Sequence, residues 1–149
     1  MRNNQPVTQR EKVLPESQRL ISTTDLKGQI TYCNEAFIDI SGFSRDELIR
    51  APHNLVRHPD VPAAVFSHMW NTLKEGKPWM GIVKNRCKNG DHYWVNAYVT
   101  PMLENRQVVG YESVRVKPTR EQIQRAEALY ARINSGKAAI SATDNVIPV

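Results

Sequence analysis

The sequence has few of the features that mark secreted or membrane-spanning chains. Cysteine occurs only twice, as Cys33 and Cys87, which is too few for a disulfide framework and lacks a CxxC spacing. The longest apolar run is four residues, whereas a membrane-spanning helix needs about 20. The polar N-terminus lacks the apolar stretch of a secretory signal. We therefore predict a soluble, cytoplasmic chain without a membrane-inserting segment, and with two buried thiols in a reducing compartment.

The residues that build catalytic and metal sites are not arranged as such sites require. The seven glycines are dispersed and form no phosphate-binding loop, and no serine stands in a G-x-S-x-G elbow. The four histidines lack the spacing of a metal site. Only His68 is a candidate for an axial haem ligand, and we favour the alternative that it is a satisfied residue on a helix face. We predict neither an enzyme nor a metal site.

Positive charge is in excess, but it lies mostly in the flanks of the chain. The 149 residues carry 20 Lys and Arg against 15 Asp and Glu, a net charge of +5. Between residues 21 and 116 the counts are 11 and 10. Nucleic-acid binders concentrate basic residues on one face, so we predict no nucleic-acid partner. The length fits one domain with flanking segments, and we place the boundaries at 1–19, 20–118 and 119–149.

The apolar pattern predicts two strands, then short helices, then three strands. β-branched and aromatic runs over 20–25 and 30–33 flank a glycine turn and indicate a hairpin. Three further strands are predicted over 79–88, 92–103 and 107–117, the first two joined by NGD, a strong hairpin signal. Strands that come in blocks exclude a doubly wound parallel fold. We predict an α+β fold, a five-stranded antiparallel sheet with short helices on one face.

Capping residues predict two short helices after the first hairpin. Asn34 is an N-cap for a helix that Gly42 closes. Ser44 and Glu47 form a capping box for the second helix, which Pro52 stops.

Two longer helices follow from the same reasoning. Asp60 is predicted to cap a helix that ends at Gly76. After Pro118, a capped helix is predicted over 119–133, and a loose tail over 135–149.

The element order and the run ITYCNEAFIDISGFSRDELI resemble the PAS family of sensory domains. The pattern N-x-x-F-x-x-x-S-G-[YF]-[ST]-x-x-E-[LI] and the later K-N-G-D-x-Y-W match that family almost position for position. PHNLVRHPD, GKPWMGIVKNR and KNGDHYWV are more specific, and look like the FAD-binding PAS domains of bacterial aerotaxis receptors. The similarity covers roughly residues 20–135. It implies FAD held noncovalently between the inner sheet face and the helices after the second strand.

The resemblance implies which residues would contact this flavin. Arg57, His58 and Asp60 would lie on the loop and helix start beside the pocket, and Trp79 and Asn85 on the third strand. An aromatic ring, an amide and a guanidinium suit the flavin's ring, its hydrogen-bonding edge and its phosphates. The alternatives are a core tryptophan bonded to backbone, an exposed strand asparagine, a surface arginine and an aspartate that only caps a helix.

Three more residues enter through the same alignment. His53 stands where light-oxygen-voltage PAS domains place the cysteine of their photoadduct, so that chemistry is not expected. Arg115 stands where those domains place a glutamine beside the flavin, although Val114 and Val116 are the alternative inward pair. Asn34, the predicted N-cap, completes the set of flavin contacts.

These features together predict a redox or oxygen-related sensor that binds FAD and signals to a chemotaxis-type transducer in aerotaxis. Its partners would be the signalling segments of a larger receptor, and it would be the cytoplasmic part of an inner-membrane protein. The alternative is a PAS module with no ligand that serves protein interaction or dimerisation. A flavin oxidoreductase is disfavoured, since no second domain is present to bind a substrate.

Strand 92–103 predicts an interface, because large apolar groups occupy both of its faces. One face would serve the pocket, and the other needs a cover. We expect the N-terminal segment, the C-terminal helix or a second subunit to supply it, and we predict a homodimer.

Overall fold

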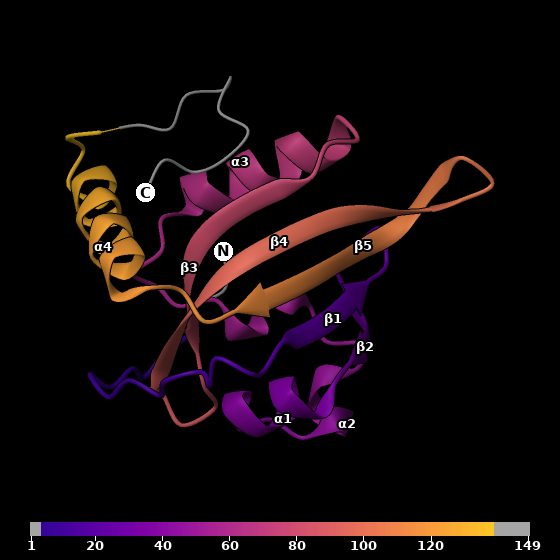
Figure 1. Cartoon of the computed structure of the whole chain (residues 1–149). Helices are drawn as coiled ribbons and strands as arrows, with labels where there is room; N and C mark the ends of the chain where they lie inside the picture. Colours follow the sequence, from indigo (N-terminus) through magenta and orange to yellow (C-terminus); the bar gives the residue numbers. More distant parts are fainter. Residues whose placement is uncertain (1–3, 139–149) are drawn as a thin grey trace.

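The computed structural model describes residues 4–138, and its five strands form one antiparallel sheet (Figure 1). The strands are β1 (Leu20–Thr24), β2 (Ile30–Cys33), β3 (Trp79–Arg86), β4 (His92–Glu104) and β5 (Gln107–Val116). Their order in the sheet is β2-β1-β5-β4-β3. The predicted α+β fold is confirmed. Of the tail predicted over 135–149, the part from residue 139 on lies outside the described residues.

Four helical segments connect β2 to β3, and a fifth follows β5. They are α1 (Glu35–Ser41), α2 (Arg45–Leu48), the 3₁₀ segment η1 (His53–Val56), α3 (Ala63–Lys74) and α4 (Arg120–Asn134). Figure 1 shows α1 and α2 near β1 and β2, whereas α3 and α4 lie near β3. Across residues 4–138, none of the helices has the length and hydrophobicity that a bilayer crossing requires.

Local capping explains where the short helices begin and end. The Asn34 side chain accepts the Phe37 N–H at the start of α1, and Gly42 ends that helix with φ +75°. Ser44 and Glu47 form the predicted capping box of α2. The prediction for Asp60 is wrong, because Pro62 is the N-cap of α3 and no side chain caps it.

Strand register decides which residues face the helices. Arg115 is 2% exposed and pairs with Leu20 of β1 and Ala97 of β4, two buried residues. Val114 and Val116 therefore point to the opposite face, where they are only partly buried. Of the two orientations that the sequence left open, the one with Arg115 inward is the observed one.

The outer face of the sheet is partly covered by the chain's own flanks. Trp94 is buried in a groove lined by Leu14 from the N-terminal segment and Ile123 from α4. Both Arg120 guanidinium nitrogens Nη1 and Nη2 donate to the Glu11 carboxylate at 3.1 Å, which ties α4 to that segment. The predicted cover by the N-terminal segment and the C-terminal helix is confirmed.

Candidate ligand-binding site

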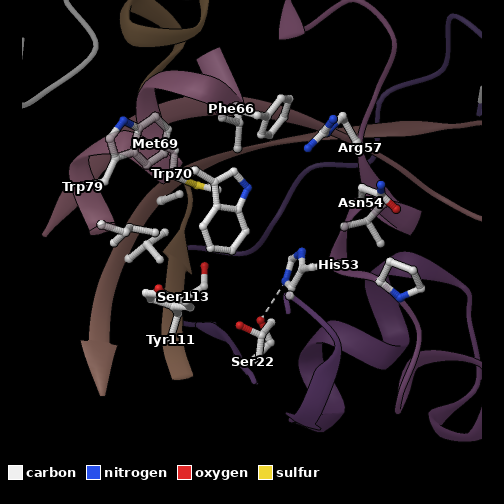
Figure 2. Close-up of a pocket in the computed structure, with 18 of the residues that line it drawn as sticks. Ser22, His53, Asn54, Arg57, Phe66, Met69, Trp70, Trp79, Tyr111 and Ser113 are labelled. Carbon is white, nitrogen blue, oxygen red and sulfur yellow. Dashed lines mark hydrogen bonds between the residues drawn. The ribbon is translucent and has the colours of Figure 1, made fainter. Parts of the chain in front are cut away.

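A cavity lies between the inner face of the sheet and the helices that cover it. Its volume is about 250 Å³, just below the ~300–1,000 Å³ typical of ligand pockets. Residues of η1 and α3 line one side, and residues of β1, β3, β4 and β5 line the other (Figure 2). Apolar and aromatic side chains form most of its wall: Val56, Phe66, Met69, Trp70, Leu73, Trp79, Val83, Ala97, Val99 and Tyr111.

Trp79 forms part of this wall and is fixed by its indole N–H. Nε1 donates to His68 Nδ1 at 2.9 Å, and Trp79 is 1% exposed. A Cβ on Gly81 would lie 2.5 Å from the indole, so only glycine leaves room for this ring. The expectation that His68 is a satisfied helix-face residue is confirmed. Trp79 is thus a buried tryptophan that also faces the cavity, and its partner is a side chain rather than backbone.

Trp70 extends from α3 toward the sheet, as Figure 2 shows. Its ring meets the Tyr111 ring edge-on, with centroids 5.2 Å apart. It also packs against the turn between β1 and β2, since a Cβ on Gly28 would lie 3.6 Å from the indole. Lys27, exposed on the same turn, lines the cavity beside them. This side of the cavity is therefore bounded by α3, β5 and the first hairpin turn.

Arg115 brings a buried positive charge to the inner face. Its Nη2 donates to Ser22 Oγ at 2.7 Å, and its Nη1 lies 3.1 Å from His53 Nε2. Its guanidinium also lies 4.4 Å from the centroid of the Phe37 ring. Burial lowers the pKa of Arg115 to about 10, so the group stays charged at neutral pH.

His53 is the acceptor that this arginine needs. A guanidinium only donates, so His53 Nε2 accepts from Arg115 and carries no proton. Ser22 Oγ, which accepts from Arg115, donates to the same nitrogen at 3.0 Å, the contact drawn dashed in Figure 2. Burial and the Arg115 charge lower the pKa of His53 to about 3. The cavity therefore holds a neutral imidazole at physiological pH.

Arg57 and Asn85 approach the cavity from neighbouring backbone segments. The Arg57 guanidinium carbon lies 3.8 Å from the centroid of the Phe66 ring, an arrangement that stabilises a cation. A backbone bridge pairs Arg57 with Asn85 on β3. Burial lowers the pKa of Arg57, yet a guanidinium remains protonated in proteins.

Three buried polar nitrogens of cavity-lining residues lack a partner among the described residues. They are Arg57 Nε, Asn85 Nδ2 and Arg115 Nε. No carboxylate lines the cavity within residues 4–138, whereas Lys27 adds a third positive charge. A buried donor without an acceptor costs about 1–3 kcal/mol, and more when it is charged. The cavity therefore suits a ligand that combines an apolar body with acceptor atoms or negative charge.

Five of the eight residues predicted for the site line this one cavity. They are His53, Arg57, Trp79, Asn85 and Arg115. The remaining three, Asn34, His58 and Asp60, are not among the residues that line it. His53 lies on η1 and Arg57 directly follows it, Trp79 and Asn85 lie on β3, and Arg115 lies on β5, so the fold brings together residues that are far apart in the sequence.

Asn34 is engaged by backbone groups instead. Its Oδ1 accepts from the N–H groups of Phe37 and Ile21, and its Nδ2 donates to the Arg19 carbonyl. His58 is buried against His92, and Asp60 accepts from Lys84 at 2.8 Å. None of these three side chains is among those that line the cavity.

Sequence reasoning missed several residues of the wall. Phe66, Met69, Trp70 and Leu73 repeat at three and four along α3, a spacing that could have identified them as one face. Lys27 carries no such signal, because its place depends on how the hairpin turn packs against α3.

The two cysteines behave as predicted, since both are buried free thiols. Burial raises the pKa of Cys87 to about 11, and burial likewise raises that of Cys33. Both groups are therefore protonated and unreactive at neutral pH. Among residues 4–138, no cluster of three or more His, Cys, Asp or Glu side chains could hold a metal ion.

Comparisons with known proteins agree with this architecture. Residues 30–115 match the family model described as the PAS fold. A light-oxygen-voltage domain studied with a flavin analogue has a TM-score of 0.66 at 18% identity, over 81% of this chain and 90% of that one. At that identity the likeness shows the fold alone.

Sequence relatives include receptors and regulators. The aerotaxis receptor of Escherichia coli is 50% identical over 131 residues, which are 88% of this chain and 26% of that receptor. The nitrogen fixation regulatory protein of Klebsiella pneumoniae is 35% identical over 83 residues, which are 56% of this chain and 17% of that protein. The chain thus spans about a quarter or less of the length of these two relatives.

Proposed function

The chain belongs to the PAS fold family, and on that premise we propose that it is a sensor domain that holds FAD noncovalently in the cavity. When bound, FAD would supply reversible electron uptake, which is the chemistry of a redox or oxygen-related sensor. The similarity to an aerotaxis receptor supports this function. The chain would then act within a larger receptor, on its cytoplasmic side, and signal to a chemotaxis-type transducer.

One observation carries the proposal: an apolar, aromatic slot contains unpartnered polar nitrogens and buried positive charge. The unpartnered nitrogens belong to Arg57, Asn85 and Arg115, and no described carboxylate lines the slot. Isolated buried cations are unfavourable unless they are paired. A flavin ring offers an apolar plane, carbonyl acceptors along one edge and negative charge upon reduction. These residues therefore fit the group that the family resemblance implies.

Each side chain has a distinct task in this proposal. Trp79 packs against the ring from a position fixed by His68. Asn85 donates to the ring's polar edge, while Arg57 and Arg115 supply positive charge. A cavity of about 250 Å³ is small for a dinucleotide and would hold only part of it.

The deciding experiment is the absorbance spectrum of the purified protein. We expect flavin bands that bleach on addition of dithionite, and FAD in the material released by heat. Arg57→Ala and Trp79→Ala should each lower FAD affinity roughly tenfold or more. Lys74→Ala, on the exposed side of α3, should leave it unchanged. A wild-type protein that neither contains nor binds FAD would refute the proposal in favour of a ligand-free module.

We also propose that a second copy of the chain covers the rest of the outer sheet face. Met80 and Tyr98, 40% and 41% exposed, are cross-strand partners, and Val114 and Ile21 continue the row on β5 and β1. A row of this kind is self-complementary across a twofold axis, as a homodimer requires.

Replacing Tyr98 by lysine should weaken this dimer, because the charge would lie inside the apolar contact. We expect wild-type protein to sediment in a monomer–dimer equilibrium, and Tyr98→Lys to weaken association about tenfold or more. Leu103→Lys, at the exposed end of β4, is the control for an added charge elsewhere on the surface. This variant should associate as the wild type does. Equal sedimentation of all three proteins would contradict the dimer.

A further inference from the structure

The segment Arg57–Asp60 passes around the edge of the sheet and joins the cavity to the outer face. β3 is an edge strand, and Arg57 pairs with it through the backbone bridge to Asn85. The Arg57 side chain stays on the cavity side, over Phe66. The next side chain, His58, is 1% exposed and packs edge-on against the ring of His92. Within this short loop, Arg57 therefore lies at the cavity, whereas His58 packs against His92 on the outer face.

The outer-face end of this loop is held by several bonds. The Asp60 carboxylate accepts from Lys84 Nζ at 2.8 Å, and the Lys84 side chain is only 6% exposed. The Asp60 N–H donates to His58 Nδ1 at 3.0 Å, which closes the turn. Asn134, the last residue of α4, donates to the Asp60 carbonyl at 2.9 Å. The loop is thus attached both to β3 and to α4.

Lys84 makes the attachment specific. A buried ammonium needs a carboxylate partner, and among the described residues Asp60 is the one that forms an ion pair with it. Lys84 faces outward on β3, beside the ring of Trp94. The position of Asp60 is therefore dictated by the sheet rather than by a ligand.

We infer that His58 and Asp60 are positioning residues, which hold Arg57 at the cavity by fixing the loop to Lys84. They act on the ligand only through Arg57, because neither side chain lines the cavity. As far as it concerns FAD, this inference rests on the proposed function. It also gives a role to His58 and Asp60, the two polar residues of this loop that do not line the cavity.

A double-mutant cycle in the FAD affinity tests the inference. We expect Lys84→Met to weaken FAD binding roughly tenfold, although Lys84 lies on the opposite face from the cavity. Asp60→Asn should weaken it to a similar extent, and the double variant no further than either single one. Asp60→Glu should restore most of the affinity. The exposed pair Glu121–Arg125 of α4 provides the matched control, since Arg125→Met should change nothing.

A second measurement follows Arg57 without any ligand. The Phe66 ring shifts the NMR signals of the Arg57 side-chain protons upfield, and Phe66→Leu identifies that shift. We expect Lys84→Met and Asp60→Asn to reduce the shift in the FAD-free protein. Unchanged Arg57 signals in both variants would overturn the inference, as would additive losses of affinity. If the wild type binds no FAD, the proposed function fails and the NMR result alone decides this inference.

Discussion

Replacing Arg115 by methionine is expected to weaken FAD binding about 10- to 100-fold while leaving the FAD-free protein as stable as the wild type, or more stable. The two effects have one cause. Arg115 is a buried cation with no carboxylate partner in the described chain, and its Nε is unsatisfied. Replacing such a group by an apolar residue of similar length often leaves the folding stability unchanged or raises it.

The affinity for FAD should fall, in contrast, because bound FAD would supply the hydrogen-bond acceptor that Arg115 lacks. A hydrogen bond to a charged group is worth about 1.5–3 kcal/mol, and each 1.4 kcal/mol is a factor of ten in affinity. Ser22 and His53 bond each other independently of Arg115, so we expect this contact and the cavity wall to persist in Arg115→Met.

Isothermal titration with FAD and urea denaturation of the FAD-free protein measure the two quantities. Arg115→Lys is the informative comparison, because it keeps the charge and loses the fork, and should fall between wild type and Arg115→Met. Arg132→Met on the exposed side of α4 controls for loss of a positive charge as such. Wild-type affinity in Arg115→Met would rule out a role of Arg115 in the site.

The sequence predicted local structure best where one residue determines it. Asn34 and the Ser44–Glu47 pair cap their helices as expected, because a cap depends on side chains within three residues of one another. The facing of Arg115 could not be predicted, since its neighbours Val114 and Val116 fit an inward strand pattern equally well. Only the pairing of β5 between β1 and β4 decides it.

The site was predictable in part for a similar reason. The resemblance supplied His53, Arg57, Trp79, Asn85 and Arg115, and all five line the cavity. The same resemblance implied His58 and Asp60 beside the pocket, and neither side chain is among those that line the cavity, because the loop passes around an edge strand. Sequence spacing does not reveal on which side of a sheet edge a loop residue lies.

Acid should destabilise the FAD-free protein well above the pH at which carboxylates titrate. The pKa of His53 is lowered to about 3 by burial and Arg115, and that of His58 to about 4 by burial and Lys84. Both rings are neutral in the folded state, whereas in the unfolded chain they bind protons near pH 6.5. The unfolded state therefore binds more protons between those limits, and stability falls as pH falls below about 6.5.

For each histidine, the size of the effect follows from the difference between its pKa in the folded and in the unfolded chain. At pH 5 each histidine costs about 2 kcal/mol relative to neutral pH, so the pair costs about 4 kcal/mol. This is a large part of the 5–15 kcal/mol that stabilises a typical domain. Urea denaturation at pH 7, 6 and 5 measures it directly.

His53→Gln distinguishes the contribution of the cavity histidine His53 to the pH dependence of stability from that of His58 on the outer face. Glutamine can still accept from Arg115 through its Oε1 and does not titrate, so this variant should lose about 2 kcal/mol less than wild type between pH 7 and pH 5. Asp46→Asn, on the exposed helix α2, should leave the pH dependence in this range unchanged, because it removes neither of the two buried histidines. A wild type whose stability is constant from pH 7 to pH 5, or a His53→Gln variant with the wild-type slope, would show that burial and Arg115 do not hold the cavity imidazole neutral.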